Sequence, residues 1–194
     1  MDQVTQYSRM SFSYPRRVFL DSSVLQALHR NGEFVYDGGE IPRNSKFWRI
    51  PEGVRDLAAL RDIMLVGARG AIELVLSQNS LEEVVDASDS SYLRWAFEVA
   101  YYWQDCLASY REQPPFSGWG ANLAVRVEGS SFGYLSTKDK KLVRDAVVLE
   151  CHAFLTLDLR LTRNAPHLEQ ALGIKVLRPA NYWCLLRPWA ALFV

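Results

Sequence analysis

Four acidic residues lie at positions where they could share one chemical task. Asp21 and Asp158 each directly follow a short apolar stretch, Glu83 follows another after about one helical turn, and Asp139 lies near the start of a predicted helix. Carboxylates brought close together repel each other and shift in pKa unless a cation lies among them. A hard divalent ion such as Mg²⁺ or Mn²⁺ is the natural occupant of such a cluster, and an ion held in this way suits phosphate chemistry.

The elements predicted around these acids explain how they could meet. Short apolar stretches at 17–20, 72–77, 153–158 and 174–179 predict strands. Helical spacing or helix-start signals cover 22–30, 53–71, 79–87, 91–110, 136–152 and 159–173, the last interrupted near Pro166. Strands separated by helices predict a three-layer α/β/α fold with a central, mostly parallel sheet. The carboxyl ends of parallel strands line one edge of the sheet, where ligands bind, so the four acids could converge there.

The length and composition fit one domain over residues 1–194 with two long insertions. A chain of 194 residues with 49% hydrophobic content can form one good core. Residues 31–52 are rich in Gly, Pro and polar types, which predicts a long loop or a small ribbon. Residues 111–135 place prolines and glycines around one alternating piece. Along 91–110, the residues Leu93, Ala96, Phe97, Ala100, Gln104 and Leu107 predict one wide core face.

Charge and cysteine content limit the partners and the compartment. Lys plus Arg and Asp plus Glu number 22 each, so nucleic acid or an anionic membrane would have to be recognised by a local patch. Cys106, Cys151 and Cys184 lack the spacing of a zinc site and are expected to be buried thiols in a reducing compartment. No N-terminal signal or apolar run of about 18 residues is present, so we expect a cytoplasmic protein without a membrane partner.

The C-terminal stretch 182–194 is apolar but is split by Arg187 and Pro188. We expect it to close the core and to contribute to a surface for self-association or for a partner. The residues assigned to that surface are Trp183, Leu185, Leu186, Trp189, Leu192 and Phe193.

Each acid also has a structural explanation. Asp21 and Asp158 could cap helices, and Ser136 and Asp139 have the spacing of a capping box. Glu83 could belong to an ordinary solvated helix face. The occurrence of all four, in order, at strand exits and helix starts favours a shared site. His29, His152 and His167 share no motif with a Ser or Cys, so a nucleophilic triad is not indicated.

The motifs around the acids resemble those of PIN-domain ribonucleases, a family that includes the VapC-like toxins of bacterial toxin–antitoxin pairs. "FLDSSVLQAL" looks like the first motif, and "LVLSQNSLEEV" resembles the second, which selects Glu83 over Glu82. "KDKKLVRDAVVLECHAFLTLD" is similar to the third and fourth motifs, and "GIKVLRPANYW" to the final strand. The resemblance covers residues 17–30, 72–87 and 136–183, about half of the chain. The two insertions are longer than in a compact toxin, and Ser23 stands where the family often has Asn.

The register of the third motif selects Asp139 rather than Asp145. Helical periodicity gives the same choice, because Asp139 lies three and four residues before the apolar stripe while Asp145 lies off it. The stripe consists of Leu142, Val143, Ala146 and Val147.

The resemblance implies metal-dependent hydrolysis of RNA phosphodiester bonds. Asp21, Glu83, Asp139 and Asp158 would be the catalytic residues and would hold one or two Mg²⁺ or Mn²⁺ ions. Thr156 would hydrogen-bond a ligating carboxylate or a metal-bound water, with Ser22 in a similar supporting role. An ordinary β-branched strand residue is an equally good explanation of Thr156.

Cations gather beside the acids and could contact an RNA backbone or form a solvated helix face. They are Lys138, Lys140, Lys141, Arg144, Arg160 and Arg163. In the second insertion, Phe116, Trp119, Phe132 and Tyr134 could stack on unpaired bases or, more simply, pack against the body of the domain.

Three functional hypotheses follow. The first is a ribonuclease, either a toxin or an RNA-processing enzyme, with RNA as substrate and with an antitoxin protein and a second copy of the chain as expected partners. The second is a catalytically weak PIN-like module that binds RNA or protein. The third is a phosphatase-type enzyme with Asp21 as nucleophile, which is disfavoured because its usual second Asp would fall at position 23, where the chain has Ser.

Overall fold

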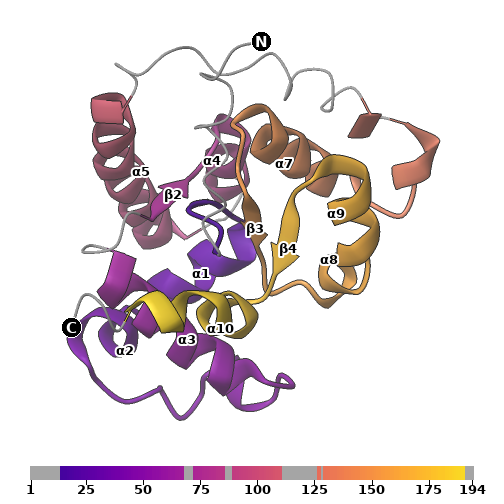
Figure 1. Cartoon of the computed structure of the whole chain (residues 1–194). Coiled ribbons are helices and arrows are strands. Elements are labelled where there is room, and N and C mark those ends of the chain that lie inside the picture. The colour runs from indigo at the N-terminus through magenta and orange to yellow at the C-terminus, as the bar shows by residue number, and fades with distance from the viewer. Residues whose placement is uncertain (1–13, 68–71, 86–88, 111–125, 128, 191–194) are drawn as a thin grey trace.

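The central sheet consists of four parallel strands. A computed structural model of the chain describes residues 14–67, 72–85, 89–110, 126–127 and 129–190. The strands β1 (Arg17–Leu20), β2 (Glu73–Val75), β3 (Ala153–Leu155) and β4 (Lys175–Leu177) lie in the order β2-β1-β3-β4 (Figure 1). In register, Phe19 of β1 is paired with Val75 of β2 and with Phe154 of β3. The predicted α/β class with a parallel central sheet is therefore confirmed.

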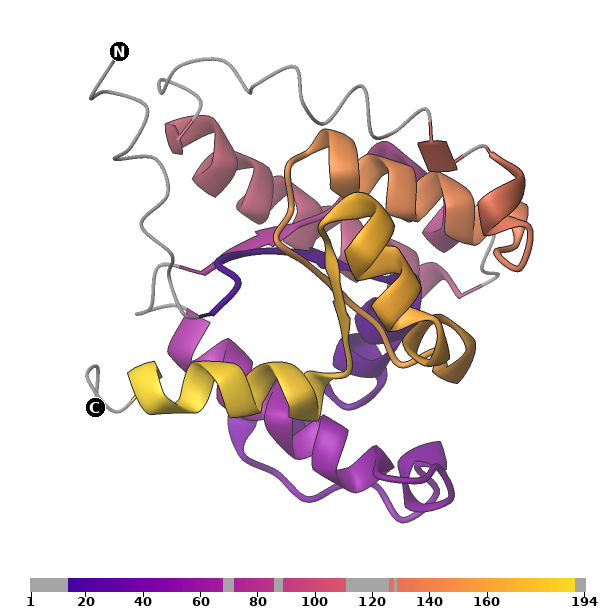
Figure 2. The ribbon, with the colours of Figure 1, turned by 45° about the vertical axis from the view of Figure 1, so that its right-hand side comes forward.

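Helices cover both faces of this sheet, as predicted. They are α1 (Ser22–Arg30), α2 (Gly32–Asp37), α3 (Gly53–Gly67), α4 (Gln78–Val85), α5 (Ser90–Tyr110), α7 (Thr137–Val148), α8 (Leu159–Arg163), α9 (Ala165–Leu172) and α10 (Pro179–Ala190), with short 3₁₀-helices η2 (Lys46–Trp48) and η3 (Ser130–Phe132). Figure 2 shows α3 and α10 on one side of the strands and α7 on the other.

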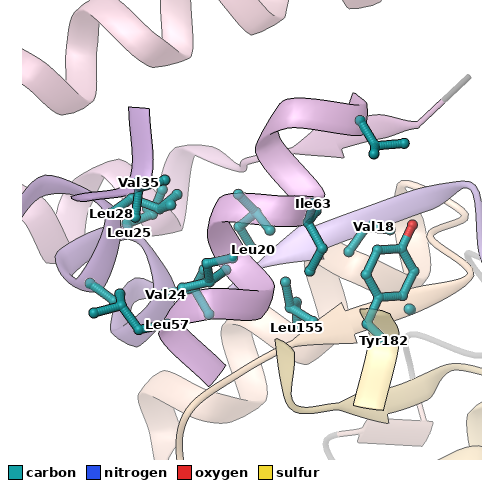
Figure 3. Close-up of a cluster of buried hydrophobic side chains, with 14 of the residues drawn as sticks. Val18, Leu20, Val24, Leu25, Leu28, Val35, Leu57, Ile63, Leu155 and Tyr182 are labelled. Carbon is teal, nitrogen blue, oxygen red and sulfur yellow. The ribbon is translucent and has the colours of Figure 1, made fainter. Parts of the chain in front are cut away.

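Two cores form because successive residues of a strand point to opposite faces. Val18 and Leu20 of β1 pack into the first core with residues of α1, α3 and α10 (Figure 3). Phe19 faces the second core, where its ring stacks on Phe154 with a centroid distance of 5.3 Å. The predicted apolar stripe of α7 is buried in this second core.

The first insertion is partly helical, so the prediction of a loop or ribbon over 31–52 was wrong for Gly32–Asp37 and Lys46–Trp48 and holds for the irregular residues between and after them. It contains α2 and η2, and Phe34, Val35 and Phe47 are buried in the first core. Buried Asn31 fixes its start, because the side-chain Nδ2 donates to the carbonyl of Ala27 at 2.9 Å and Oδ1 accepts from Ser45 Oγ at 3.2 Å. Of the second insertion, residues 111–125 and 128 lie outside the described residues.

Two helices differ in detail from their predictions. The helix predicted over 159–173 divides at Asn164 into α8 and α9, and Pro166 lies in the first turn of α9, where a missing backbone N–H is tolerated. On α5, Ala96 and Ala100 are buried as expected, but Phe97 is 47% exposed. Over the residues of α5 whose side chains the structure describes, the buried face is therefore narrower than the sequence predicted, and the side chains of Gln104 and Leu107 lie outside them.

The C-terminal helix closes the first core, as predicted. Tyr182 and Leu186 are buried there, and the Tyr182 hydroxyl donates to the carbonyl of Pro15 at 2.8 Å. Leu186 is thus not available to a partner, whereas Trp189 is 39% exposed. Leu192 and Phe193 lie outside the described residues.

A buried ion pair fixes α10 against α3. Asp56 of α3 is fully buried and accepts from Arg178 Nε at 2.8 Å, with a second contact from Arg178 Nη2. Its other oxygen accepts from the backbone N–H of Ala180 at 3.1 Å, in the first turn of α10. Neither oxygen of this buried carboxylate is left without a donor, which keeps its burial from being destabilising.

The cysteines only partly follow their prediction. Cys151 is buried, but Cys184 is exposed on α10 and the side chain of Cys106 lies outside the described residues. Across the described ranges, none of the helices is both long enough and apolar enough to cross a membrane.

Candidate active site

Asp21 lies at the carboxyl end of β1, in the middle of the sheet edge. Its backbone N–H donates to the carbonyl of Leu155 at 3.0 Å, which extends the pairing of β1 with β3 by one residue. The side chain is only 5% exposed. Its Oδ2 accepts from Ser23 Oγ at 2.5 Å and from Thr156 Oγ1 at 2.7 Å. Among the described residues no donor reaches its other oxygen, Oδ1, so that oxygen is the one left to bind a ligand.

Thr156 and Ser23 connect the loops that follow β1 and β3. Thr156 is fully buried, and besides donating to Asp21 its hydroxyl accepts from the backbone N–H of Asp158 at 2.9 Å. Ser23 Oγ accepts from the backbone N–H of Leu157 at 3.0 Å. Thr156 thus has a polar role beyond that of a strand residue. The serine that holds Asp21 is Ser23, so the supporting role expected of Ser22 was assigned one residue too early.

Glu83 and Asp139 lie within electrostatic reach of Asp21. Burial raises the pKa of Asp21 above its usual value, the hydrogen bonds from Ser23 and Thr156 lower it, and the charges of Glu83 and Asp139 raise it further. Glu83 is half-buried on α4 while Glu82 is exposed, which agrees with the choice of Glu83. Three of the four predicted acids, Asp21, Glu83 and Asp139, are therefore close enough to interact electrostatically.

Asp139 forms the capping box of α7 that its spacing predicted. Its Oδ2 accepts from the N–H of Ser136 at 3.2 Å and from Ser136 Oγ at 2.7 Å, and its own N–H donates to Ser136 Oγ at 3.1 Å. Asp145 has a different partner, because it accepts from Asn79 Nδ2 of α4 at 2.6 Å. Asp139 is thus a helix-capping residue, and its charge also raises the pKa of Asp21.

Asp158 is held by Arg160 rather than by the other acids. Its Oδ1 caps α8 by accepting from the N–H of Arg160 at 2.7 Å, and its Oδ2 lies 2.7 Å from Arg160 Nη2. The hydrogen bond from the Arg160 side chain is the largest cause of the lowered pKa of Asp158. The charge of Asp139 also acts on Arg160. Asp158 thus has Arg160 as its hydrogen-bonded partner, and Asp139 acts on the same guanidinium through its charge.

The donors fit a hard cation in chemistry, but they are not gathered into a finished ligand set. All four side chains offer carboxylate oxygens, which Mg²⁺ and Mn²⁺ prefer. The buried hydroxyl of Tyr92, whose pKa is raised first by burial and then by the charges of Glu83 and Asp21, has no hydrogen-bond partner among the described residues. Yet within the described part of the chain no three Asp, Glu, His or Cys side chains lie close enough together to hold an ion in common.

The predicted cations lie beside the acids on α7 and α8. Lys140 is half-buried, and the other five are exposed, namely Lys138, Lys141, Arg144, Arg160 and Arg163. Of the aromatic residues considered for stacking, Phe132 is buried in the second core, and Tyr134 pairs through its hydroxyl with His167 Nδ1 at 2.9 Å. Packing thus explains Phe132, while Phe116 and Trp119 lie outside the described residues.

Sequence reasoning named Ser23 only as a departure from the family motif, without giving it a supporting role, and it missed Tyr92. The first motif contains Ser23, two residues after Asp21, so that spacing was an available signal. Nothing local distinguishes Tyr92 from the other aromatic residues of α5, and only the packed structure brings it near Glu83.

Comparison of the chain with family models, with curated proteins and with solved structures found no match. The resemblance to PIN-domain ribonucleases therefore rests on the motifs themselves.

Proposed function

We propose that this protein is a metal-dependent ribonuclease that hydrolyses phosphodiester bonds of RNA. Its catalytic and metal-binding residues would be Asp21, Glu83, Asp139 and Asp158, with Mg²⁺ or Mn²⁺ as cofactor. The observation that carries the proposal is the state of Asp21, a buried carboxylate at the carboxyl edge of a parallel sheet whose pKa is raised by burial and by the charges of Glu83 and Asp139. Such perturbed groups cluster at functional sites, and a cation would offset their repulsion.

In this proposal each group of residues has a separate task. Ser23 and Thr156 hold Asp21 through Oδ2, which leaves Oδ1 for a ligand. Exposed cations of α7 and α8 attract the phosphate backbone toward the sheet edge. A bound Mg²⁺ or Mn²⁺ would lower the pKa of a water molecule and offset the charge that develops on the phosphate.

The test is cleavage of a labelled single-stranded RNA by the full chain with Mn²⁺, with Mg²⁺ and with excess chelator. We expect cleavage with either ion and none with chelator. Glu83→Gln should lower the rate by at least about 100-fold, because it removes a charged ligand. The matched control is Glu82→Gln, an exposed neighbour on the same helix, which should cleave at the parental rate. Cleavage that persists in chelator, or equal losses in the two variants, would refute the proposal.

A second candidate is a catalytically weak PIN-like module that binds RNA or protein. The contact that favours it is the pairing of Asp158 with Arg160, which occupies the fourth predicted ligand. This candidate predicts that the parent protein binds single-stranded RNA but leaves it intact with Mg²⁺ and with Mn²⁺. It also predicts that Asp158→Asn changes RNA binding little.

The biological setting forms part of the same proposal. A toxin would have an antitoxin protein as partner, an RNA-processing enzyme would not, and either could pair with a second copy of the chain. The gene that neighbours this one separates the first two cases, since a small, charged, partly disordered product would favour the toxin. We propose a cytoplasmic location because Cys151 and Cys184 are both free thiols.

A further inference from the structure

Tyr92 differs from the other buried polar side chains in hydrogen bonding. Among the described residues, its hydroxyl is the only buried side-chain oxygen or nitrogen atom without a hydrogen-bond partner. The remaining buried polar residues, Asp21, Asn31, Asp56, Ser80 and Thr156, are all hydrogen-bonded. A buried hydroxyl without a partner destabilises a fold, so an exception of this kind calls for a specific explanation.

The position of Tyr92 is fixed by its surroundings. The residue is 4% exposed and lies in the first turn of α5, where its N–H donates to Asp89 Oδ1 at 3.2 Å. Its ring lies 5.2 Å from the ring of His29 and 6.3 Å from that of Trp95, centroid to centroid. The hydroxyl therefore does not turn out to solvent to find water.

The hydroxyl lies near the proposed site. Helix α5 packs against α4, which carries Glu83, and against α1, which begins directly after Asp21. Burial raises the pKa of Tyr92 to about 12, and the charges of Glu83 and Asp21 are the next causes. The charge of Glu83 in turn acts on Asp21. The three groups thus share one neighbourhood.

Within that neighbourhood the donors and acceptors do not balance. Asp21 already accepts two hydrogen bonds at Oδ2. Glu83 is half-buried and makes no side-chain hydrogen bond or ion pair to any other described residue, so its carboxylate is open to a further donor, while the buried Tyr92 hydroxyl is a donor without an acceptor. Repulsion from Asp21 opposes any movement of Glu83 toward the site unless a cation lies between them.

We propose that Tyr92 is a positioning residue for Glu83, and that its hydroxyl donates a hydrogen bond to the Glu83 carboxylate when Asp21 and Glu83 hold a divalent cation. This inference rests on the proposed function, because it needs a cation at these acids. It gives the unpartnered Tyr92 hydroxyl an acceptor, through a hydrogen bond that forms only in the metal-bound protein. Outer hydrogen bonds of this kind orient metal ligands and strengthen metal binding.

The experiment compares Tyr92→Phe with Tyr182→Phe in the full chain, by thermal unfolding without metal and by calorimetric titration with Mn²⁺. Without metal, Tyr92→Phe should melt at the parental temperature or higher, since it removes a hydroxyl that has no partner. Its Mn²⁺ affinity should fall roughly 10-fold. Tyr182→Phe removes a hydroxyl that donates to Pro15, so it should melt roughly 2–4 °C lower and bind Mn²⁺ like the parent.

The pairing with Glu83 is tested by combining the substitutions. In a Glu83→Gln protein, adding Tyr92→Phe should change the Mn²⁺ affinity by less than about twofold, because the pair is already broken. A parent that binds no Mn²⁺ would overturn both this inference and the proposed function. A parent that binds Mn²⁺ and cleaves RNA, with Tyr92→Phe binding equally tightly, would overturn the inference alone. So would a metal-free Tyr92→Phe protein that melts several degrees lower, because the hydroxyl would then have a partner within the fold.

Discussion

Replacing Thr156 by Val tests whether Thr156 is only a β-branched strand residue or whether its hydroxyl holds Asp21 in place. Val has nearly the same shape and retains the β-branch, but it lacks the hydroxyl that donates to Asp21 at 2.7 Å and accepts from the N–H of Asp158 at 2.9 Å. If Thr156 is only a β-branched strand residue, Val should be as stable as Thr or slightly better. If the hydroxyl holds the loops together, Val removes two buried contacts at once.

The size of the effect follows from those two contacts. A buried polar group left without its partner costs about 1–3 kcal/mol, and the N–H of Asp158 belongs at the lower end because it is only partly buried. The loss should therefore be about 2–4 kcal/mol in the free energy of unfolding, which lowers the Tm by about 4–16 °C in a chain of this size. Thr156→Ser is the control, because it retains the hydroxyl and loses one methyl group, at a cost of about 1 kcal/mol.

The assay is urea unfolding at neutral pH without divalent ions, repeated at acidic pH. Hydrogen bonds to an ionised carboxylate lower its pKa, so Val should raise the pKa of Asp21 further. A raised pKa in the folded state means that stability is fully present below the ordinary value of 3.8 and is lost as the pH rises through the folded-state pKa. The difference between parent and Val variant should then be largest at neutral pH and should shrink toward that value. A Val variant as stable as the parent, or more stable than the Ser variant, would refute the reasoning.

Three further predictions concern the rest of the fold. Burial and then the charge of Arg17 lower the pKa of His152, and its Nδ1 accepts hydrogen bonds from the N–H groups of Arg16 and Arg17. The contribution of His152 to stability should therefore be present above the ordinary pKa of 6.5 and be lost as the pH falls. Melts of parent and His152→Ala should differ at neutral pH and converge near about pH 5, and a constant difference would contradict this. Arg178→Leu leaves the buried carboxylate of Asp56 without its cation and should lower the free energy of unfolding in urea by about 3–5 kcal/mol. The double variant Asp56→Leu with Arg178→Leu should recover part of this loss, and no recovery would argue against a charge effect. Gly53→Ala places a Cβ 2.5 Å from the carbonyl oxygen of Phe47 and should lower the Tm, whereas Gly67→Ala on the same helix meets no atom within 4 Å and should not, so equal effects would exclude the clash as the cause.

The sequence could predict the sheet and its helices because those elements are encoded locally. The short apolar stretch in "RVFL" and the helical spacing of "SSVLQALHR" predicted β1 and α1 with the bounds that the structure has. The first insertion could not be read in this way. Its helix α2 has six residues, begins at Gly32 and ends at Gly38 with φ of 73°, so its glycines looked like loop signals. Burial of Phe47 against α3 is a long-range contact that no local pattern carries.

For the candidate site, the sequence supplied a set of candidate residues, and the structure added their contacts. Ordered motifs identified the acids, and the spacing of Ser136 and Asp139 correctly predicted a capping box. Whether Ser22 or Ser23 faces Asp21 depends on how the chain turns into α1, which residue type does not reveal. The partner of Asp158 was more accessible to reasoning, because an N-cap followed two residues later by Arg is a local pattern.

The two aspartates that follow β1 and β3 differ in how firmly they are held, and this difference sets what the site can do. Asp21 is buried and fixed by two hydroxyl groups, so it is already in place for a ligand. Asp158 pairs with Arg160, whose side chain is 75% exposed, and an exposed ion pair contributes little to stability. Exchanging that partner for another group therefore needs little energy, whereas moving Asp21 would break its hydrogen bonds to Ser23 and Thr156. In the proposed site, Asp21 would fix the position of a bound ion, and Asp158 would adapt to it.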